Sequence, residues 1–490
     1  MKRNLTLTLM TFAMVASLSG CAVGPDYKGA PQIDAGTAFK EAQGFKQANP
    51  QDLAPRGKWW EAYNDSTLNG LIDQVQVTNQ TVKQFEAQYR QARAAGEVAR
   101  AAYWPTLGLD LSASRSQSNT STVSGTGGSQ ATVQRSAVKN NYGAILNASW
   151  EPDIWGKVRR QVEAQDANTQ AVAANLAAAL LSAQATLAQD YFQLRVIDAQ
   201  KVLLTQTVDA YQKSLTLTQN QYKAGIVTRA DVAQAQTQLL TAQASLTDLG
   251  VSRAQLEHAI AILIGKAPAN FSLPEQSALT ATLPDVPAGV PSDLLQRRPD
   301  IASAERAVAQ ANANVGVATA AMYPALTLSG SGGYQGNEWG NLFDLPNRIW
   351  SLGAGLTQPL FEGGLLKAGQ QEAEAQYDAT VAEYRQTVLG GLQEVEDNLA
   401  ALRILQDEAQ TQDLAVKAAQ DSANLALNQY KAGTATYVNV ATTQASLLSA
   451  ERSALDVQQR RFTANVLLIK ALGGGWTTAQ MTQNQTASAK

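Results

Sequence analysis

Hydrophobic and polar residues alternate one by one in four short stretches, two in each half of the chain. In the first of them, leucine or alanine fills every second position from Leu107 to Ala113, with Gly, Asp and Ser between them. A period of two is typical of a β-strand with one apolar face and one face in water. Residues 116–137, crowded with Ser, Thr, Gly and Gln, predict an exposed, mobile loop. We therefore predict four strands, at about residues 104–116, 138–151, 324–332 and 349–360.

Two much longer stretches, residues 158–222 and 365–430, contain no proline and repeat apolar residues at steps of three and four. This pattern predicts coiled-coil-like helices, and at a rise of about 1.5 Å per residue ~65 residues reach roughly 100 Å. The apolar seams are narrow and flanked by Ala, Gln, Asn and Thr, which favours helices joined side by side around water. A plain long antiparallel coiled coil would show the same periodicity, so both arrangements stay open.

The chain also contains an internal repeat. The hexapeptide NQYKAG at residues 220–225 returns unchanged at residues 428–433, 208 positions later. That period is too long for a solenoid and indicates one duplicated structural unit. We assign residues 59–266 to a first repeat with a turn near residue 225, 267–298 to a linker, 299–472 to a second repeat with a turn near 433, and 473–490 to a polar, disordered tail.

The N-terminus predicts an export signal. A basic start and an apolar run lead into Leu-Ser-Gly-Cys at residues 18–21, the pattern of a signal peptide that ends in a lipobox. We expect residues 1–20 to be removed and Cys21, the only cysteine, to carry a covalent lipid, with residues 21–58 as a lipidated extended segment. Ala22 follows the cysteine where an aspartate would favour the inner membrane, so the outer membrane is the expected location.

No stretch after the signal peptide has eighteen consecutive apolar residues, whereas each alternating stretch is near the ~10 residues that a tilted membrane strand needs. Four strands cannot close a barrel, and open edges are not tolerated in lipid. Three copies would supply twelve strands and leave a hole in the middle. An ordinary soluble sheet with one buried face is the alternative, because alternation alone does not distinguish lipid from a protein core.

Charge and chemistry exclude several classes of function. The formal net charge is −3, from 38 Lys and Arg against 41 Asp and Glu, and no long basic run is present, so we expect no nucleic-acid partner. His258 is the single histidine, and no nucleophile elbow, phosphate-binding loop or dinucleotide fingerprint accompanies it. We therefore expect no enzyme, no metal site and no cofactor other than the lipid on Cys21.

Several motifs carry a resemblance to a known family. They are CAVGPDY at residues 21–27, the Trp pair at 59–60, and above all LLQRRPDI at 294–301. With these the chain resembles the TolC-like outer membrane factors, in particular the lipoprotein branch that serves tripartite multidrug efflux pumps.

The resemblance implies an α+β membrane protein of a Gram-negative bacterium, anchored in outer membrane lipid and extending into the periplasm. Its long antiparallel helices would form a trimeric α-barrel and its four strands per chain a twelve-stranded trimeric β-barrel. A periplasmic adaptor and an inner-membrane efflux transporter would open its closed tip. A structural coiled-coil periplasmic lipoprotein and an exit duct for type I protein secretion are the alternatives, and the lipobox and the Arg-Arg-Pro-Asp signature favour efflux of small molecules.

The resemblance also implies where the periplasmic tip lies. The two repeated hexapeptides would turn one long helix into the next, and Gly225 and Gly433 would be the helix C-caps. The motif residues either serve the caps alone or contact the adaptor as well, and both possibilities stay open; they are Tyr222, Lys223, Tyr430 and Lys431.

By the same resemblance, Asp231 is an acidic tip residue and Tyr430 hydrogen-bonds toward it as a gate latch, with Arg229 in the same tip group. Where relatives carry inward-pointing aspartates on the last hairpin, this chain has Asn439 and Thr442. Three carboxylates around one axis would attract cations, and three amides would not. We therefore predict a polar, weakly charged constriction that is less cation-selective than those of its relatives.

Overall fold

The computed structural model describes residues 22–34, 36–42, 58–124, 131–277, 281–286 and 291–478. The signal peptide, the lipidation predicted at Cys21 and the tail from residue 479 lie outside the described residues. The chain divides into two compact units, which are Met1–Ala30 with Gln91–Thr169 and Ala307–Val381, and Pro31–Arg90 with Gln170–Arg306 and Ala382–Lys490.

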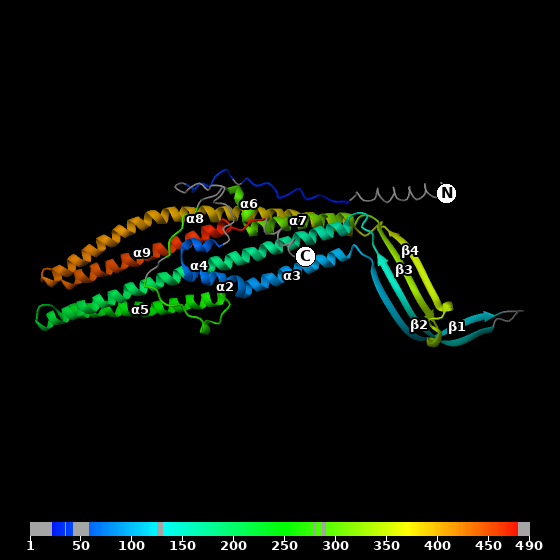
Figure 1. Ribbon diagram of the computed structural model, residues 1–490, viewed down its shortest axis with the longest axis horizontal. Coiled ribbons are helices and arrows are strands. Elements are labelled where there is room, and N and C mark those ends of the chain that lie inside the picture. The colour runs from blue at the N-terminus through cyan, green and yellow to red at the C-terminus, as the bar shows by residue number, and fades with distance from the viewer. Residues whose placement is uncertain are drawn as a thin grey trace. The chain divides into compact units, whose positions relative to one another are not determined.

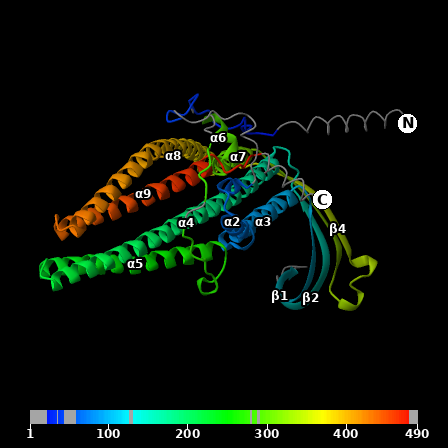
Figure 2. The ribbon, with the colours of Figure 1, turned by 60° about the vertical axis from the view of Figure 1, so that its left-hand side comes forward.

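The first unit contains a four-stranded antiparallel sheet (Figures 1 and 2), and all four predicted strands are confirmed. The loop predicted at residues 116–137 is wrong for most of its length, because cross-strand pairing continues from Ser116 opposite Lys139 to Ser124 opposite Ala131. Ser and Thr look loop-like in composition, yet their backbone groups pair as any others do. The strands lie in the order β1 (Thr106–Ser124), β2 (Ala131–Trp150), β3 (Ala325–Gly336) and β4 (Arg348–Thr357).

The register separates the sheet into one apolar and one polar face. The row that runs from Leu109 through Leu146 and Gly332 to Trp350 is apolar, and its large side chains are exposed, Leu109 to 66% and Trp350 to 71%. The neighbouring row on the opposite face is Gly108, Asn147, Ser331 and Ser351, where the two serine hydroxyls lie 2.9 Å apart. Within the described chain, the apolar face is thus left open to its surroundings.

Six of the described α-helices occur in pairs of equal length, which confirms the internal duplication, whereas α2 (Ser66–Thr78) and α6 (Leu294–Arg297) differ in length. The two longest, 67 residues each, are followed by helices of 35 residues, and each strand pair is preceded by a helix of 22 residues. Figures 1 and 2 show α5 beside α4 and α9 beside α8, so each repeat contributes one long hairpin. The pairs are α3 (Gln80–Ala101) and α7 (Pro299–Ala320), α4 (Lys157–Lys223) and α8 (Leu365–Lys431), and α5 (Arg229–Leu263) and α9 (Tyr437–Ala471).

One of these helices, α4, contains an 18-residue stretch with a mean hydropathy of 1.5, enough to cross a membrane by length and composition. Of that stretch, 44% is buried within the chain. Helix α4 also lies against the aromatic core of the second unit. There the ring of Phe192 lies 4.5 Å from that of Phe462 and 4.9 Å from that of Tyr63, and the predicted Trp pair at 59–60 is buried in the same cluster.

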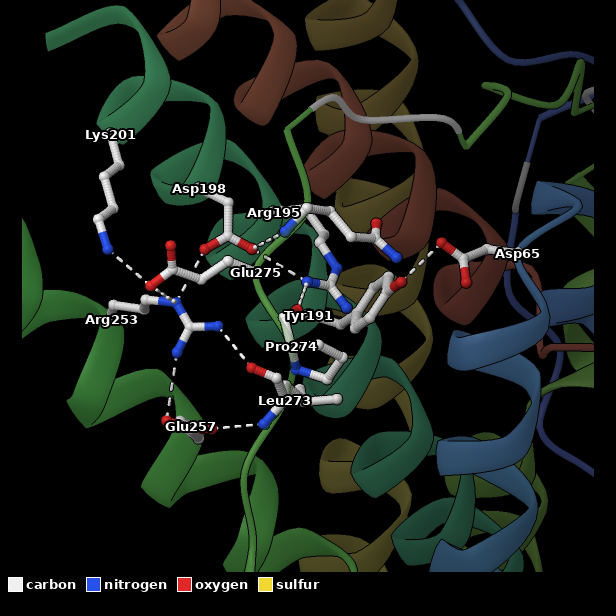
Figure 3. Close-up of polar contacts among 11 residues, drawn as sticks. Asp65, Tyr191, Arg195, Asp198, Lys201, Arg253, Glu257, Leu273, Pro274 and Glu275 are labelled. Atoms are coloured by element: carbon white, nitrogen blue, oxygen red, sulfur yellow. Dashed lines mark hydrogen bonds and ion pairs between the residues drawn. The ribbon is translucent and has the colours of Figure 1, made fainter. Parts of the chain in front are cut away.

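The linker after α5 is held by four charged side chains (Figure 3), which we name the connector clamp: Arg195, Asp198, Arg253 and Glu257. Three residues of the linker bond side chains of α4 and α5 through backbone groups, and these are Leu273, Pro274 and Gln276. Glu275 accepts from Lys201 of α4 through its side chain. The Leu273 carbonyl accepts from Arg253 at 2.7 Å, and the Pro274 carbonyl accepts from Arg195 at 2.9 Å. Asp198 accepts from both arginines and from the Gln276 amide, and Glu257 accepts from the Leu273 amide.

The Arg-Arg-Pro-Asp signature forms the junction between the linker and the second repeat. Arg298 is buried and donates two hydrogen bonds to Asp300, one to Glu394 at 2.7 Å, and one to the carbonyl of Ala471, the last residue of α9. In the first repeat, Asn79 bonds the carbonyl at the end of α5 in the same way. In each repeat, a side chain just before the 22-residue helix, Asn79 before α3 or Arg298 before α7, therefore bonds a carbonyl at the C-terminus of the last helix.

The disorder predicted from residue 473 is wrong for residues 473–478. Residues 473–478, expected to be disordered, are described, and the Thr478 amide donates to the Gln296 carbonyl at 3.1 Å. This contact ties the residues after α9 to α6 (Leu294–Arg297), so polar composition alone was a poor guide to order here.

Candidate functional site: the tip of the helical hairpins

The two hairpin turns have the same backbone geometry. Gly225 and Gly433 have positive φ angles of 74° and 75°, which an L side chain adopts only with strain. In the first turn the Gly225 amide donates to the Tyr222 carbonyl, and the Ile226 amide donates to the Gln221 carbonyl, both at 2.9 Å. The second turn repeats both bonds. This is the Schellman arrangement, so both glycines end their helices as C-caps do.

The helices that leave the turns begin differently. Thr228 and Asp231 form a capping box at the start of α5, in which the Asp231 carboxylate accepts from the Thr228 amide at 2.9 Å. The repeat places Thr436 and Asn439 at the matching positions of α9, where Thr436 makes no side-chain cap bond. The carboxylate of Asp231 is therefore engaged by its own helix.

Two tyrosines connect the hairpins near the tip. Tyr430 of α8 is buried, and its hydroxyl lies 3.0 Å from the hydroxyl of Thr218 on α4. The hydroxyl of Tyr437 on α9 donates to the Gln238 side chain on α5 at 3.1 Å, and the Gln238 amide donates in turn to the Ala441 carbonyl. We name the four side chains, Thr218, Gln238, Tyr430 and Tyr437, the tip latch.

The hydrogen bond that the resemblance implied between Tyr430 and Asp231 is not made in the described chain, because each residue has another partner. Sequence reasoning missed Tyr437 and Gln238. The signal available was the repeat itself: Tyr437 occupies the position of Arg229, so an aromatic replaces a cation at the first residue of the last helix. Its ring meets that of Tyr430 edge to face at 5.5 Å.

The tip latch is uncharged at physiological pH. Burial raises the pKa of Tyr437 to about 12. Burial also raises the pKa of Tyr430, and the negative charge of Asp231 raises it further, while the bond to Thr218 acts in the opposite direction. Both phenols therefore keep their protons, and the link between the hairpins consists of neutral hydrogen bonds and ring packing.

The other predicted tip residues lie on the surface. Tyr222 is 46% exposed. Lys223, Arg229 and Lys431 are exposed. None of the three forms an ion pair within the part of the chain that the structure describes. Asn439 and Thr442 are exposed one helical turn apart on α9, and the Thr442 hydroxyl bonds the Val438 carbonyl of its own helix.

A polar groove of about 1300 Å³ lies next to the tip latch. Hydroxyl groups of α5 and α9 line much of it, and among its described lining residues only Arg452 and Asp456 carry a charge. No group of residues in the described segments could hold a metal ion. The Ser and Thr residues of α5 and α9 that line this groove are Thr237, Thr241, Ser245, Thr442, Ser446, Ser449 and Ser453.

Sequence comparisons match nearly the whole chain to known proteins. The family model for outer membrane efflux proteins matches residues 71–266 and 290–474. The chain is 30% identical over 488 residues to the antibiotic efflux pump outer membrane protein ArpC of Pseudomonas putida, covering 99% of both chains. It is also 30% identical over 470 residues to the pyoverdine export outer membrane protein OpmQ of Pseudomonas aeruginosa, covering 96% of this chain and 97% of that one.

Solved structures show the same fold. The outer-membrane channel OprN is 28% identical, with a TM-score of 0.83 over 93% of this chain and 100% of that one. The open state of the MtrE outer membrane channel of Neisseria gonorrhoeae is 29% identical, with a TM-score of 0.79 over 94% of this chain and 99% of that one.

Proposed function

Since this chain belongs to the outer membrane efflux protein family, we propose that it is the exit duct of a tripartite pump, through which small molecules leave the periplasm passively. The chain is an outer membrane efflux channel of a Gram-negative bacterium. The proposal adds that three copies form the duct, that Cys21 carries the lipid, and that no step is catalysed. A periplasmic adaptor and an inner-membrane transporter would supply the substrate and the energy.

The observation that carries the proposal is the sheet with one apolar and one polar face. Its apolar row from Leu109 to Trp350 is exposed, as a surface that faces lipid would be. Its outer strands β1 and β4 have one unpaired edge each, and lipid cannot satisfy those backbone groups. Three copies would close the edges into twelve strands, with the serine and asparagine face toward a water-filled interior.

The tip is the proposed gate. The tip latch joins the two hairpins of one chain, so an adaptor that separates α5 from α9 would have to break the bond between Tyr437 and Gln238. Lys223 and Lys431 are exposed at the turns and are the proposed adaptor contacts. Their positive charges would suit an acidic or hydroxyl-bearing adaptor surface.

Planar-bilayer recording tests the channel. The purified protein should produce stepwise ion conductance, whereas a structural periplasmic lipoprotein would produce none. Leu109→Arg, on the apolar face, should abolish insertion because a cation at the membrane midplane costs about 2–4 kcal/mol. Asp110→Arg, the neighbouring residue on the polar face, is the matched control and should still insert.

The same recordings test the gate. With Asn439 and Thr442 at the constriction, the reversal potential in a salt gradient should show only weak cation preference, and Asn439→Asp should make it strong. Strong cation preference in the unaltered protein that Asp231→Asn abolishes would move the selectivity ring to Asp231 and contradict the assignment.

A further inference from the structure

The first described residues of the chain, 22–26, occupy a built site in the first unit, and we name them the N-terminal strap. The Val23 amide donates to the Trp155 carbonyl at 3.0 Å, in the loop that leads into α4. The Asn312 side chain of α7 donates to the Pro25 carbonyl, also at 3.0 Å. Backbone groups of the strap are therefore bonded on one side to the first repeat and on the other side to the second.

Arg160 of α4 provides the charged contact. Its side chain is 6% exposed and donates to the Asp26 carboxylate at 2.5 Å, while its other terminal nitrogen donates to Glu163 at 2.8 Å. A buried guanidinium needs such partners, because an unpaired buried cation is strongly destabilising. Among the described residues, Asp26 supplies one of the two carboxylates that Arg160 contacts, so the strap completes the environment of this residue.

Close backbone contact fixes the strap in place. A Cβ on Gly24 would lie 2.5 Å from the Cα of Gly316 on α7, and a Cβ on Gly316 would lie 2.9 Å from the Cγ of Arg160. Neither approach leaves room for a side chain. Gly24 also has a φ angle of +94°. A segment that lay loosely on the surface would not require glycine at both positions of this close backbone contact.

From these contacts we propose that the N-terminal strap is a fastener that locks α4 of the first repeat to α7 of the second, with Arg160 as its receptor. The described strap begins beside Trp155, whose ring stacks on Tyr323 at 4.9 Å and whose indole donates to the Pro324 carbonyl, just before β3 begins.

The second part of the inference rests on the proposed function. If Cys21 carries the lipid, a docked strap holds the acyl chains at the base of the sheet. If the strap were undocked, the acyl chains would be joined to the fold only through a flexible segment. The fastener itself requires only the contacts of residues 22–26, so its failure and the failure of the proposed lipidation are separable.

Hydrogen exchange measured by mass spectrometry on the purified full-length protein tests the fastener. In peptides that begin at residue 21 or earlier and contain Val23, the Val23 amide should exchange slowly in the unaltered protein, because it is hydrogen-bonded to the Trp155 carbonyl. In Gly316→Ala, the new methyl group displaces Arg160, and exchange of the strap should accelerate by about tenfold or more, with a lower thermal midpoint of the whole protein.

Gly369→Ala is the matched control. Gly369 is also a helical glycine, and a Cβ there meets nothing within 4 Å. Both substitutions favour the helical conformation by about 1 kcal/mol. A fall in stability that occurs only in Gly316→Ala is therefore caused by the lost contacts around Arg160 and the strap, and not by a change in helix propensity. Asp26→Asn, at a side chain that is 83% exposed, is a milder second variant that should fold and should accelerate strap exchange to an intermediate degree.

Two results would overturn the fastener: fast exchange of residues 22–26 in the unaltered protein, or release of the strap in Gly316→Ala without any loss of thermal stability. Cys21→Ser separates the two proposals. Slow strap exchange in that variant supports docking without the lipid, whereas fast exchange there would contradict it. The mass of the N-terminal peptide of the unaltered protein tests lipidation independently.

Discussion

Tyr437 is the side chain on which the connection between α9 and α5 depends. Its hydroxyl donates to Gln238, its ring meets that of Tyr430, and it belongs to a cluster of buried hydrophobic residues. Tyr430 makes the equivalent contact between α8 and α4 through Thr218. A latch made of neutral groups resists changes of salt, because screening acts on charges, and it opens by the loss of a few modest bonds.

Tyr437→Phe should favour the open tip. The substitution keeps the ring and removes one hydrogen bond worth about 1 kcal/mol per chain, so the opening equilibrium should shift about fivefold. Single-channel recording should show larger or more frequent openings. Tyr222→Phe, at an exposed tyrosine of the turn, is the control and should leave the recordings unchanged. Identical recordings for the two variants would exclude Tyr437 from the gate.

Alkaline pH should weaken the same site. The pKa of Tyr437 is raised to about 12, above its ordinary value near 10, so the folded chain keeps a proton that the unfolded chain loses. Its contribution to stability is complete below pH 10 and is lost as the pH rises through about 12. The thermal midpoint should therefore fall over this range, and less steeply in Tyr437→Phe. Equal slopes in both proteins would contradict the assignment.

At the scale of elements, charged side chains hold the segments that no helix or strand contains. The connector clamp binds three linker residues to α4 and α5, and Arg298 binds the start of α7 to the end of α9. Such segments lack the regular backbone hydrogen bonds of a helix or a sheet, so their backbone groups bond to side chains instead. The clamp supplies those partners from two arginines and two acids.

Asp198→Asn tests the clamp. Asp198 is 1% exposed and faces both Arg195 and Arg253, so the loss of its charge should destabilise the fold by about 3–5 kcal/mol. Denaturant unfolding monitored by circular dichroism measures this. Glu275→Gln removes a half-exposed partner of Lys201 in the same network and should cost no more than about 1 kcal/mol. Equal losses in the two variants would show that burial of Asp198 is irrelevant.

The sequence alone predicted the positions of the helices and strands better than it predicted which side chains contact one another. The absence of proline and the apolar seams located α4 and α8 to within a residue or two, and alternation located all four strands. The extension of β1 and β2 was missed because Ser and Thr favour loops by composition. The bond between Tyr437 and Gln238 was missed because periodicity assigns a residue to a face and not to a partner on another hairpin.

The N-terminal strap shows the same limit. Its motif was read as a family signature, and the contacts of Gly24 and Asp26 with residues far along the chain required the structure. Residues 267–298 were predicted to be a linker, but nothing in their composition indicated that Arg195 and Arg253 hold it. Long-range partners of this kind depend on topology, which local pattern does not contain.

At the scale of the whole molecule, the account requires more than one copy of the chain. A sheet of four strands with an exposed apolar face and two unpaired edges is incomplete in lipid when alone. The equal halves of the chain supply two hairpins and two strand pairs, so three copies would give six hairpins and twelve strands around one axis. The water-filled passage follows from that number, because eight strands would be filled by their own side chains.

Native mass spectrometry of the full-length protein, released from detergent micelles, tests this claim most directly because it counts the copies. The account predicts a single dominant species of three chains, from a preparation that also conducts ions in planar bilayers. A stable, folded single chain in the same detergent, with no trimer at any protein concentration, would contradict it.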